Sequence, residues 1–334
     1  MVLVTGGTGL TGSHLLLHLL ENGEIVRAVF RDDNSIQKTK SLFNLHNKSH
    51  MFEKIEWHQS DITDVPALEL AFMDIDYVYH CAGLISFDPN DEEKLRKTNI
   101  EGTSNIVNLC IANHIKKLCH VSSIAALGDL KANEKFYSEE TEWNPEKPHN
   151  DYAISKYGAE MEIWRGQQEG LEIVIINPGV ILGAGFWNAG SGEIFSLVKK
   201  GLKFYTMGTT GFVNVKDVIV LMHKLMNSNV TGERIIAVAE NISFRDILYN
   251  IADAMKVKRP DTYAKPWMSS LAWRVDWLVS KISGSKRRLT QDDSHALHTT
   301  TMYSNEKAQR LFNFEFTDVK TSVKEIVKLQ SKAD

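Results

Sequence analysis

A tyrosine and a lysine four residues apart form the pair best suited to acid–base chemistry in this sequence. Tyr152 and Lys156 stand in the segment Tyr-Ala-Ile-Ser-Lys, and a helix would carry both on one face. A phenol with a pKa near 10 is a poor proton donor at neutral pH, and a nearby ammonium lowers that pKa toward the working range. The second pair with this spacing, Tyr303 and Lys307, has no serine-bearing strand beside it, and we interpret it as surface chemistry.

Two serines precede this pair and give it a hydrogen-bonding partner. Ser122 and Ser123 end a predicted strand, and Ser123 lies 29 residues before Tyr152, which leaves room for a returning loop. A hydroxyl there would donate to a carbonyl or alcohol oxygen beside Tyr152. The alternative interpretation of either serine is a cap at the strand end.

A glycine-rich turn near the start of the chain predicts a dinucleotide site. Gly6, Gly9 and Gly12 follow a predicted strand and open a predicted helix. This spacing allows a tight turn, brings backbone N–H groups onto a pyrophosphate and packs the helix close to the sheet. We expect the cofactor to contact the turn residues Gly6, Thr8, Gly9, Leu10, Thr11 and Gly12.

The residue that closes the second predicted strand indicates which dinucleotide is preferred. Arg31 lies nineteen residues after Gly12, where an acidic residue would bind a ribose 2′-hydroxyl and an arginine favours a 2′-phosphate. Asp32 and Asp33 follow directly and would compete for its guanidinium. We therefore expect NADP, with NAD as the alternative.

Short β-branched runs alternate with helical patterns in the first half, which predicts a doubly wound α/β fold with a Rossmann-type parallel sheet. The predicted strands are Val2–Thr5, Ile25–Phe30, Ile55–His58, Tyr77–Cys81, Leu118–Ser122 and Ile173–Asn177. The predicted helices are Leu10–Asn22, residues 35–45, Val65–Phe72, Glu92–Asn113 and Tyr152–Gln168. Gly23 and Gly170 follow two of these helices, where left-handed caps are expected.

The alternation ends after Pro178, which predicts a smaller, mostly helical C-terminal lobe that binds substrate. We expect residues 1–180 to form the dinucleotide-binding domain, with a segment at 212–240 that returns to add one strand. Residues 181–211 and 241–334 would form the lobe, with 183–211 as a glycine-rich loop. Such a lobe would cover the carboxyl edge of the sheet, where open α/β sheets bind ligands.

Bulk composition excludes several classes of protein. The chain has 334 residues, 43% of them hydrophobic and 24% charged, and a formal net charge of −4. This balance is typical of a soluble globular protein and carries no basic footprint for nucleic acid. Three scattered cysteines predict neither a disulfide framework nor a metal site. Neither a secretory segment nor a membrane-spanning run is recognised, so we expect a cytoplasmic protein.

Taken together, these motifs resemble the extended short-chain dehydrogenase/reductase family, also described as the NAD-dependent epimerase/dehydratase superfamily. The segments that carry the resemblance follow one another in the family's order: residues 5–12, Ser60-Asp61-Ile62, residues 80–83, residues 98–103, Val121-Ser122-Ser123, Tyr152 to Lys156, Asn177-Pro178-Gly179 and residues 212–218. Family members often dimerise, so the resemblance leaves a homodimer open.

The resemblance implies a role for each matched residue. Ser123 would hold the substrate oxygen, Tyr152 would be the acid–base, and Lys156 would tune it and hold the nicotinamide ribose. The remaining implied cofactor contacts are Asp61 and Ile62 at the adenine, Ala82 and Gly83 under the ribose, Asn99 near the site, and Pro178 and Val180 beside the nicotinamide amide. For Asn99 the alternative is an amide that holds a bend in its helix.

The residues after Ser123 favour one branch of the family. Ile124-Ala125-Ala126-Leu127 lacks the acidic pair that a nucleotide-sugar dehydratase would need. The sequence looks closer to dihydroflavonol reductases and 3β-hydroxysteroid dehydrogenases, which implies hydride transfer between an NAD(P) cofactor and a ketone, aldehyde or alcohol. The alternatives are a nucleotide-sugar epimerase with a tightly held cofactor and a dinucleotide-sensing protein without turnover.

Aromatic residues of the lobe are candidates for an apolar substrate pocket. They are Phe186, Trp187, Phe195, Phe204, Trp267 and Trp273. Trp273 and Trp277 lie beside Arg274 and Lys281, a pattern that also suggests a helix at a membrane surface. The basic run at 286–288 is interpreted as a solvated loop.

Overall fold

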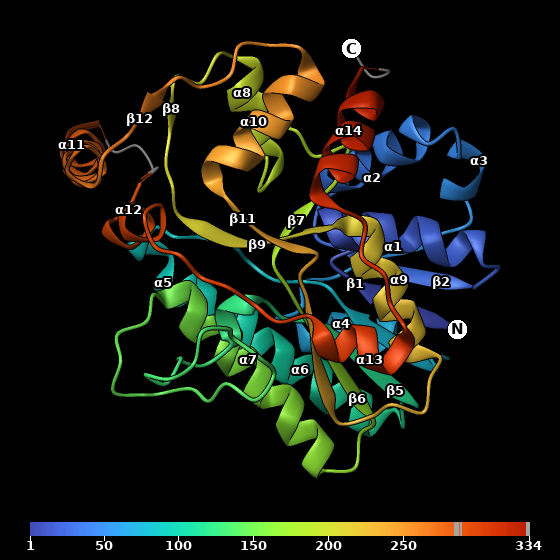
Figure 1. Ribbon diagram of the computed structural model, residues 1–334. Coiled ribbons are helices and arrows are strands. Elements are labelled where there is room, and N and C mark those ends of the chain that lie inside the picture. The colour runs from blue at the N-terminus through green and yellow to red at the C-terminus, as the bar shows by residue number, and fades with distance from the viewer. Residues whose placement is uncertain (284–286, 288, 332–334) are drawn as a thin grey trace.

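A seven-stranded parallel sheet forms the centre of the structure, a computed structural model that describes residues 1–283, 287 and 289–331 (Figure 1). Its strands are β1 (Val2–Thr5), β2 (Val26–Phe30), β3 (Glu56–Gln59), β4 (Tyr77–His80), β5 (Lys117–Val121), β6 (Ile173–Pro178) and β10 (Glu233–Ala237). They are ordered β10-β6-β5-β4-β1-β2-β3, and every neighbouring pair is parallel. The order reverses between β1 and β4, which is where such sheets bind ligands.

Helices cover both faces of this sheet, so the expected doubly wound Rossmann-type fold is confirmed (Figure 1). One face packs on α1 (Leu10–Glu21), α2 (Asp33–Leu45), α3 (Ser49–Phe52), α9 (Val215–Met226) and α13 (Glu306–Phe312). The other packs on α4 (Val65–Ala71), α6 (Gly102–Ala112) and α7 (Asp151–Gln168). Each face has its own buried aliphatic core.

The predicted elements lie close to the observed ones. Each predicted strand begins within one residue of the observed strand, and each predicted helix within two. Gly23 and Gly170 have φ values of +81° and +96°, the left-handed caps that the sequence predicts. Strand β10, within the segment 212–240, pairs with β6 at the edge of the sheet.

The helix predicted over residues 92–113 is not uniform. It runs as α5 (Glu92–Leu95), a π-helical turn η2 (Arg96–Glu101) and then α6. Two 3₁₀ turns, η1 (Pro89–Asp91) and η3 (Ile124–Ala126), lie at the same end of the sheet. A π-turn re-aims the side chains that it carries, and this one contains Asn99.

The smaller lobe contains more regular structure than predicted. The prediction of a loop at 183–211 is wrong. This segment contains α8 (Gly192–Lys199) and β8 (Phe204–Tyr205), and its last residues begin β9. Its glycines obscured the helix, which buries Phe195 and Val198 in the lobe core. The other lobe elements are β7 (Val180–Leu182), β9 (Thr209–Asn214), β11 (Glu240–Ser243), β12 (Thr262–Tyr263), α10 (Phe244–Met255), α11 (Pro266–Ser283), α12 (Gln291–Ala296) and α14 (Val319–Gln330). Strands β7, β9 and β11 form a second sheet.

A buried lysine ties the central sheet to the end of α9 and to the segment that follows it. The ammonium of Lys117, on β5, donates to the carbonyls of Leu225 and Ser228 at 2.8 and 2.9 Å. Burial lowers the pKa of Lys117, and these two carbonyls replace the water that the ammonium gives up. The middle of the sheet thus depends on residues more than a hundred positions later in the chain.

A buried histidine makes the stability of the fold sensitive to acid. His14 on α1 is buried with its Nε2 3.1 Å from the carbonyl oxygen of Ala184, and burial lowers its pKa to about 4. Between pH 6.5 and 4 the unfolded chain therefore binds a proton that the folded chain does not, so stability falls as the pH falls. The loss reaches about 3 kcal/mol.

We expect His14→Gln, which has no titrating ring, to reduce this dependence when urea unfolding is measured between pH 7 and 4, while His80 and His120, whose pKa values burial also lowers, retain the remainder. The exposed His50 provides the matched control, because His50→Gln should leave the slope unchanged. Equal slopes for His14→Gln and the wild type would show that protonation of His14 does not limit stability.

Candidate active site

Helix α7 holds Tyr152 and Lys156 at the carboxyl end of β5. Its first turn is fixed by Asn150, whose side chain accepts a hydrogen bond from the Ala153 N–H at 2.8 Å. One turn further along, the Lys156 ammonium donates to the carbonyl of Val121, the last residue of β5, at 2.9 Å. The helix and the strand end therefore hold the lysine in one position.

Ser123 and Tyr152 face one another across this edge. Burial raises the pKa of Tyr152, and a side-chain hydrogen bond with Ser123 partly offsets that rise. The Ser123 hydroxyl also accepts the Ala125 N–H at 3.1 Å and so caps η3. Both sequence interpretations of Ser123, the strand-end cap and the tyrosine partner, describe its observed contacts.

The electrostatics of Lys156 suit a proton relay. Burial lowers its pKa to about 8, while the Glu160 carboxylate acts in the opposite direction. The ammonium is therefore still charged at pH 7 although it is withdrawn from water. A buried cation stabilises a neighbouring phenolate more strongly than an exposed one does.

A buried polar network lies beneath these residues. Glu160, fully buried on α7, accepts hydrogen bonds from the Ser122 hydroxyl at 2.7 Å and the Asn177 amide at 2.9 Å. Arg234 of β10 lies 3.1 Å from the same carboxylate, and Asn177 also donates to the Ser123 carbonyl at 3.0 Å. Ser122 thus points away from the cleft, and the network fixes the backbone that carries Ser123.

The glycine turn between β1 and α1 is shaped to receive a pyrophosphate. Gly6 has a φ of +67°, and a Cβ on Gly12 would lie 2.1 Å from the Gly6 carbonyl oxygen. Gly9 caps α1 without a side-chain hydrogen bond, and the first helical turn, which includes Leu10 and Thr11, has no acidic residue. Backbone N–H groups at such a helix start bind phosphate oxygens. The turn therefore fits the dinucleotide that the sequence predicts.

Arg31 and Asp61 lie side by side at the ends of β2 and β3. The Arg31 guanidinium is 68% exposed and lies 3.8 Å from the Asp61 carboxylate. Asp61 also accepts the Thr63 N–H and hydroxyl at 2.9 and 2.8 Å. The expected competitor Asp32 instead caps α2 through the Ser35 N–H at 3.0 Å. Arg31 therefore remains accessible to a phosphate.

The turn after β4 brings the predicted ribose contacts next to α7. A Cβ on Gly83 would lie 3.4 Å from the Asn99 side-chain oxygen and 3.8 Å from the Lys156 nitrogen. A Cβ on Gly6 would lie 2.6 Å from the Ala82 backbone nitrogen. The turns after β1 and β4 are thus in contact at the point where the strand order reverses.

Asn99 is a buried scaffold residue. Its amide donates to the Leu84 carbonyl at 3.0 Å and to the Ser155 hydroxyl at 2.9 Å, and its side-chain oxygen accepts the Leu84 N–H at 2.7 Å. Because these contacts occupy the amide, the side chain holds the loop after β4 against α7.

Three further predicted contacts lie in tightly packed surroundings. Ile62 is buried, and a Cβ on Gly102 would lie 2.5 Å from its side chain. Pro178 ends β6 and Val180 begins β7, so both lie at the seam between the two sheets.

The described residues contain no group of three or more His, Cys, Asp or Glu side chains that could hold a metal ion.

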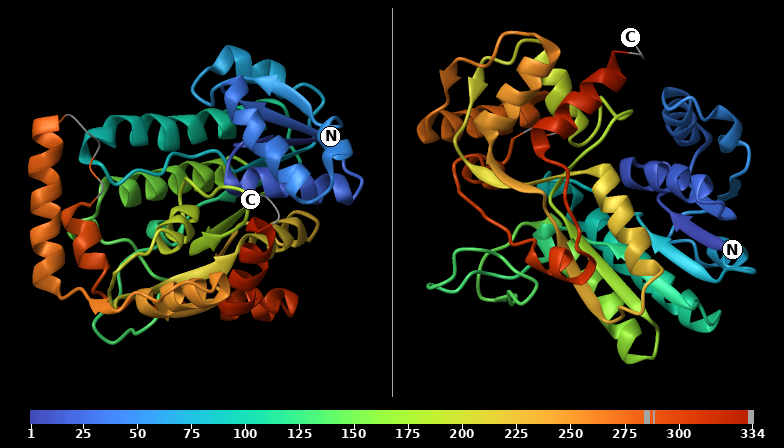
Figure 2. Two further views of the ribbon diagram at one scale, coloured as in Figure 1. Left: turned by 90° about the horizontal axis from the view of Figure 1, so that it is seen from above. Right: turned by 45° about the vertical axis from the view of Figure 1, so that its right-hand side comes forward.

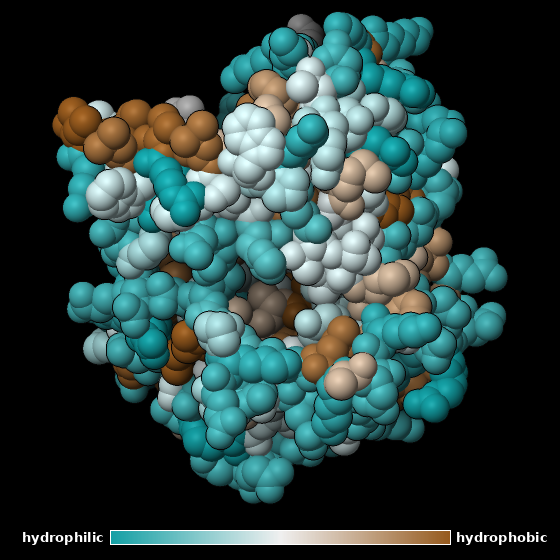
Figure 3. All heavy atoms as spheres, turned by 60° about the vertical axis from the view of Figure 1, so that its left-hand side comes forward, coloured by the Kyte–Doolittle hydropathy of each residue, from teal (hydrophilic) through white to brown (hydrophobic). Residues whose placement is uncertain are grey.

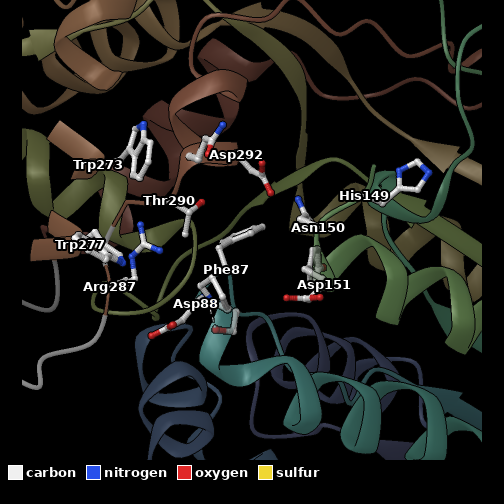
Figure 4. A pocket seen from close by; sticks show the side chains of 14 residues that line it. Phe87, Asp88, His149, Asn150, Asp151, Trp273, Trp277, Arg287, Thr290 and Asp292 are labelled. Atoms are coloured by element: carbon white, nitrogen blue, oxygen red, sulfur yellow. Dashed lines mark hydrogen bonds between the residues drawn. The ribbon is translucent and has the colours of Figure 1, made fainter. Parts of the chain in front are cut away.

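A cavity of about 380 Å³ opens directly onto Tyr152 (Figure 4). Phe87, from the loop after β4, packs against the tyrosine with 5.4 Å between ring centroids. Trp273 and Trp277 approach from α11, and Thr290 and Asp292 from the start of α12. The cavity therefore combines aromatic walls with a polar rim.

Of the six aromatic candidates for the pocket, only Trp273 lines this cavity. Phe195 is fully buried in the lobe core, and Trp187 packs against it. Phe204 and Trp267 are exposed to solvent instead. In the basic run at 286–288, Arg287 lies on the cavity wall, 4.0 Å from Asp276, while Lys286 and Arg288 lie outside the described residues.

Comparison with known protein families gives the family of this chain. The NAD dependent epimerase/dehydratase family matches residues 2–239, which include β1 to β10 and every predicted catalytic and cofactor-binding residue. The chain belongs to this family. Its members use a dinucleotide, in agreement with the geometry of the glycine turn.

Within the epimerase/dehydratase family, the chain is similar to several curated proteins, two of which are named as reductases. A putative dihydroflavonol 4-reductase from Synechocystis sp. is 28% identical over 84% of this chain and 80% of its own length. Sterol demethylase protein B from Methylococcus capsulatus is 26% identical over 77% of this chain and 75% of its own. Tetraketide alpha-pyrone reductase 2 from Arabidopsis thaliana is 28% identical, with coverage of 78% and 83%.

Solved structures share the fold of this family member. The protein gox2253 superposes with a TM-score of 0.81 at 23% identity, covering 100% of this chain and 98% of its own. A UDP-glucose 4-epimerase from Thermotoga maritima superposes with a TM-score of 0.78 at 18% identity, covering 99% of both chains. At these identities the likeness shows the fold alone.

Sequence reasoning missed the network beneath the epimerase/dehydratase site. Glu160 is four residues after Lys156 and eight after Tyr152, so its place on the same helical face was a usable signal. Arg234 carried no such signal, because 74 residues separate it from Glu160.

The second Tyr-x-x-x-Lys pair is not surface chemistry as predicted. Tyr303 is packed against Tyr137 with 5.3 Å between ring centroids, and burial raises its pKa. Lys307 forms an ion pair with Glu233 at 2.6 Å. The pair is therefore structural. It lies far from the glycine turn in the sequence, and the Glu233 carboxylate balances the charge of Lys307.

Proposed function

We propose that this chain is an NAD(P)-dependent reductase that interconverts a ketone or aldehyde with an alcohol. One observation carries the proposal: Tyr152, which is hydrogen-bonded to Ser123 and lies one helical turn before the buried Lys156, lines an aromatic-walled cavity. The similarity to dihydroflavonol and tetraketide pyrone reductases supports the same chemistry. The absence of an acidic pair after Ser123 argues against loss of water.

In this proposal the chain's own residues manage the oxygen and the proton. The bound cofactor supplies the hydride that reduces the carbonyl carbon. Ser123 donates a hydrogen bond to the carbonyl oxygen and fixes its position, and Tyr152 transfers its phenolic proton to that oxygen as negative charge develops there. The Lys156 ammonium stabilises the tyrosinate that remains until a solvent proton replaces the one transferred.

The proposal includes the division of labour along the chain. Residues 1–180, with the segment returning at 212–240, would bind the dinucleotide through Gly6, Thr8, Gly9, Leu10, Thr11 and Gly12 and through the strand-end residues described above. Residues 181–211 and 241–334 would bind the substrate. We further propose a preference for NADP, because Arg31 is exposed while its neighbour Asp32 is engaged as a helix cap.

Exchanging the charge at position 31 tests that preference. We expect Arg31→Asp to lower the ratio of kcat/KM for NADPH to that for NADH by about 100-fold, because a phosphate loses a cation and gains a repelling carboxylate. Arg310→Asp, an exposed arginine on α13, changes the net charge equally and should leave the ratio as it is. An unchanged ratio in Arg31→Asp would remove Arg31 from the 2′-phosphate site.

Substrate class is tested by NADPH consumption against a panel of aromatic ketones, steroid-like ketones and small aldehydes. We expect steady consumption with the bulky apolar carbonyls, since the cavity is walled by Phe87, Trp273 and Trp277. Failure to consume NADPH, with nucleotide retained through purification, would contradict the reductase and favour an epimerase that recycles its cofactor. UDP- and GDP-sugars would then form the next panel. Bound cofactor that never changes redox state would indicate a sensing protein.

A further inference from the structure

Helix α11 turns an apolar face to the outside. Five of its residues, spaced three or four apart, are at least 51% exposed: Trp267, Leu271, Val275, Leu278 and Ile282. This spacing forms one stripe along the helix, about 22 Å long at 1.5 Å per residue. Figure 2 shows the helix standing at the edge of the molecule, and Figure 3 shows a brown row of apolar side chains there.

Two polar residues of α11, Ser269 and Asp276, face the protein, while the apolar stripe faces outward, the reverse of an ordinary surface helix. Ser269 is buried under the helix, and the Ser269 hydroxyl lies 2.9 Å from Nε2 of His298. The Asp276 carboxylate accepts the Leu289 N–H at 3.3 Å and lies 4.0 Å from Arg287. A continuous apolar stripe left in water in this way marks a contact surface.

Basic side chains flank the stripe. Arg274 lies over the ring of Trp273 and Lys281 over the ring of Trp277, each 4.5 Å from the centroid. The single acidic residue of the helix, Asp276, is directed inward. The outer side of α11 therefore combines an apolar stripe, which includes the ring of Trp267, with flanking positive charge, and this combination matches an anionic lipid surface.

The charges disfavour a second copy of the chain as the occupant. Two such helices crossing near their middle about a twofold axis would bring both Arg274 side chains together. Asp276 is engaged with the protein interior and would not offset that repulsion. Lipid phosphates and carboxylates supply the complementary charge directly.

We propose that α11 docks the protein on an anionic bilayer by lying in the headgroup region with its apolar stripe toward the acyl chains. None of the described helices is both long enough and apolar enough to cross a membrane, so the attachment is peripheral. The surface lies on the same helix as the cavity residues Trp273 and Trp277. The docking goes beyond the proposed reductase and does not depend on it.

Vesicle sedimentation of the whole protein tests the proposal. We expect binding to phosphatidylcholine vesicles containing about one-third phosphatidylserine, weakening as salt rises, and little binding to phosphatidylcholine alone. The double variant Leu271→Glu, Leu278→Glu should bind at least about tenfold more weakly, since its carboxylates would enter the apolar region. Lys281→Gln, which removes one flanking charge, should lower the affinity for these vesicles about fivefold.

The matched control places the same charges on exposed apolar residues elsewhere. Ile25→Glu, Leu70→Glu alters side chains that are 68% and 59% exposed and should bind vesicles like the wild type. Circular dichroism and thermal melts establish that each variant is folded. The proposal is overturned if the wild type binds neither vesicle type, or if the control variant loses vesicle binding as fully as the α11 variant. A dimer that only the α11 variant abolishes, without vesicle binding, would assign the stripe to a second copy.

Discussion

Tyr152→Phe should reduce kcat by about 10³-fold while the Kd for the reduced cofactor changes by less than about twofold. The substitution removes the one proton that the phenol can transfer and leaves the ring packed against Phe87. The contacts of Lys156 with the end of β5 do not involve the hydroxyl and should persist. Single-turnover consumption of NADPH measures the first quantity, and quenching of protein fluorescence by the cofactor measures the second.

The chain supplies its own control for this experiment. Tyr303→Phe removes a buried phenol from the same four-residue pattern, at a position where the lysine is paired with Glu233. We expect its kcat to stay within about twofold of the wild type. If Tyr152→Phe weakened cofactor binding as much as turnover, Tyr152 would be a structural residue and the assigned proton transfer would be wrong.

Gly12→Ala should abolish cofactor binding without preventing folding. The added Cβ would lie 2.1 Å from the Gly6 carbonyl oxygen, so the turn must open and move its N–H groups away from the phosphate position. We expect the Kd for NADPH to rise at least about 100-fold, corresponding to about 3 kcal/mol. Isothermal titration of the purified variant gives this value directly.

Gly23, at the other end of the same helix, separates steric conflict from the general cost of replacing a glycine. Its φ is +81°, yet a Cβ there would meet no atom within 4 Å. Gly23→Ala should therefore destabilise the protein by about 1 kcal/mol and leave cofactor affinity unchanged. Equal affinity losses in the two variants would point to helix destabilisation rather than to a remodelled turn.

The features that sequence predicted well are encoded locally. The alternation of short apolar strands with amphipathic helices established the strand starts to within a residue, because burial on both faces of a parallel sheet demands it. The glycine turn was equally predictable from the sequence, since only glycine tolerates the φ of Gly6 and the crowding at Gly12. The Tyr152–Lys156 spacing likewise needed nothing beyond helical geometry.

What sequence could not predict depends on contacts between distant segments. The π-turn around Asn99 is held by Leu84 and Ser155, neither of which a helical period reveals. Phe195 and Trp273 are both aromatic residues in amphipathic helices, yet one is in the core and the other walls the cavity. Whether each ring lies in the core or on the cavity wall depends on how the lobe packs, and residue type alone does not predict that packing.

Arg234 and the segment that binds Lys117 have a consequence for how the protein is made. As the chain leaves the ribosome, Ser123, Tyr152 and Lys156 emerge well before Leu225, Ser228 and Arg234. Until those later residues arrive, β6 has an open edge, Glu160 lacks its ion pair with Arg234, and the Lys117 ammonium has no carbonyl partners. A nascent chain that already contains Ser123, Tyr152 and Lys156 is therefore unfinished, and translation must proceed past β10 before this part of the sheet is complete.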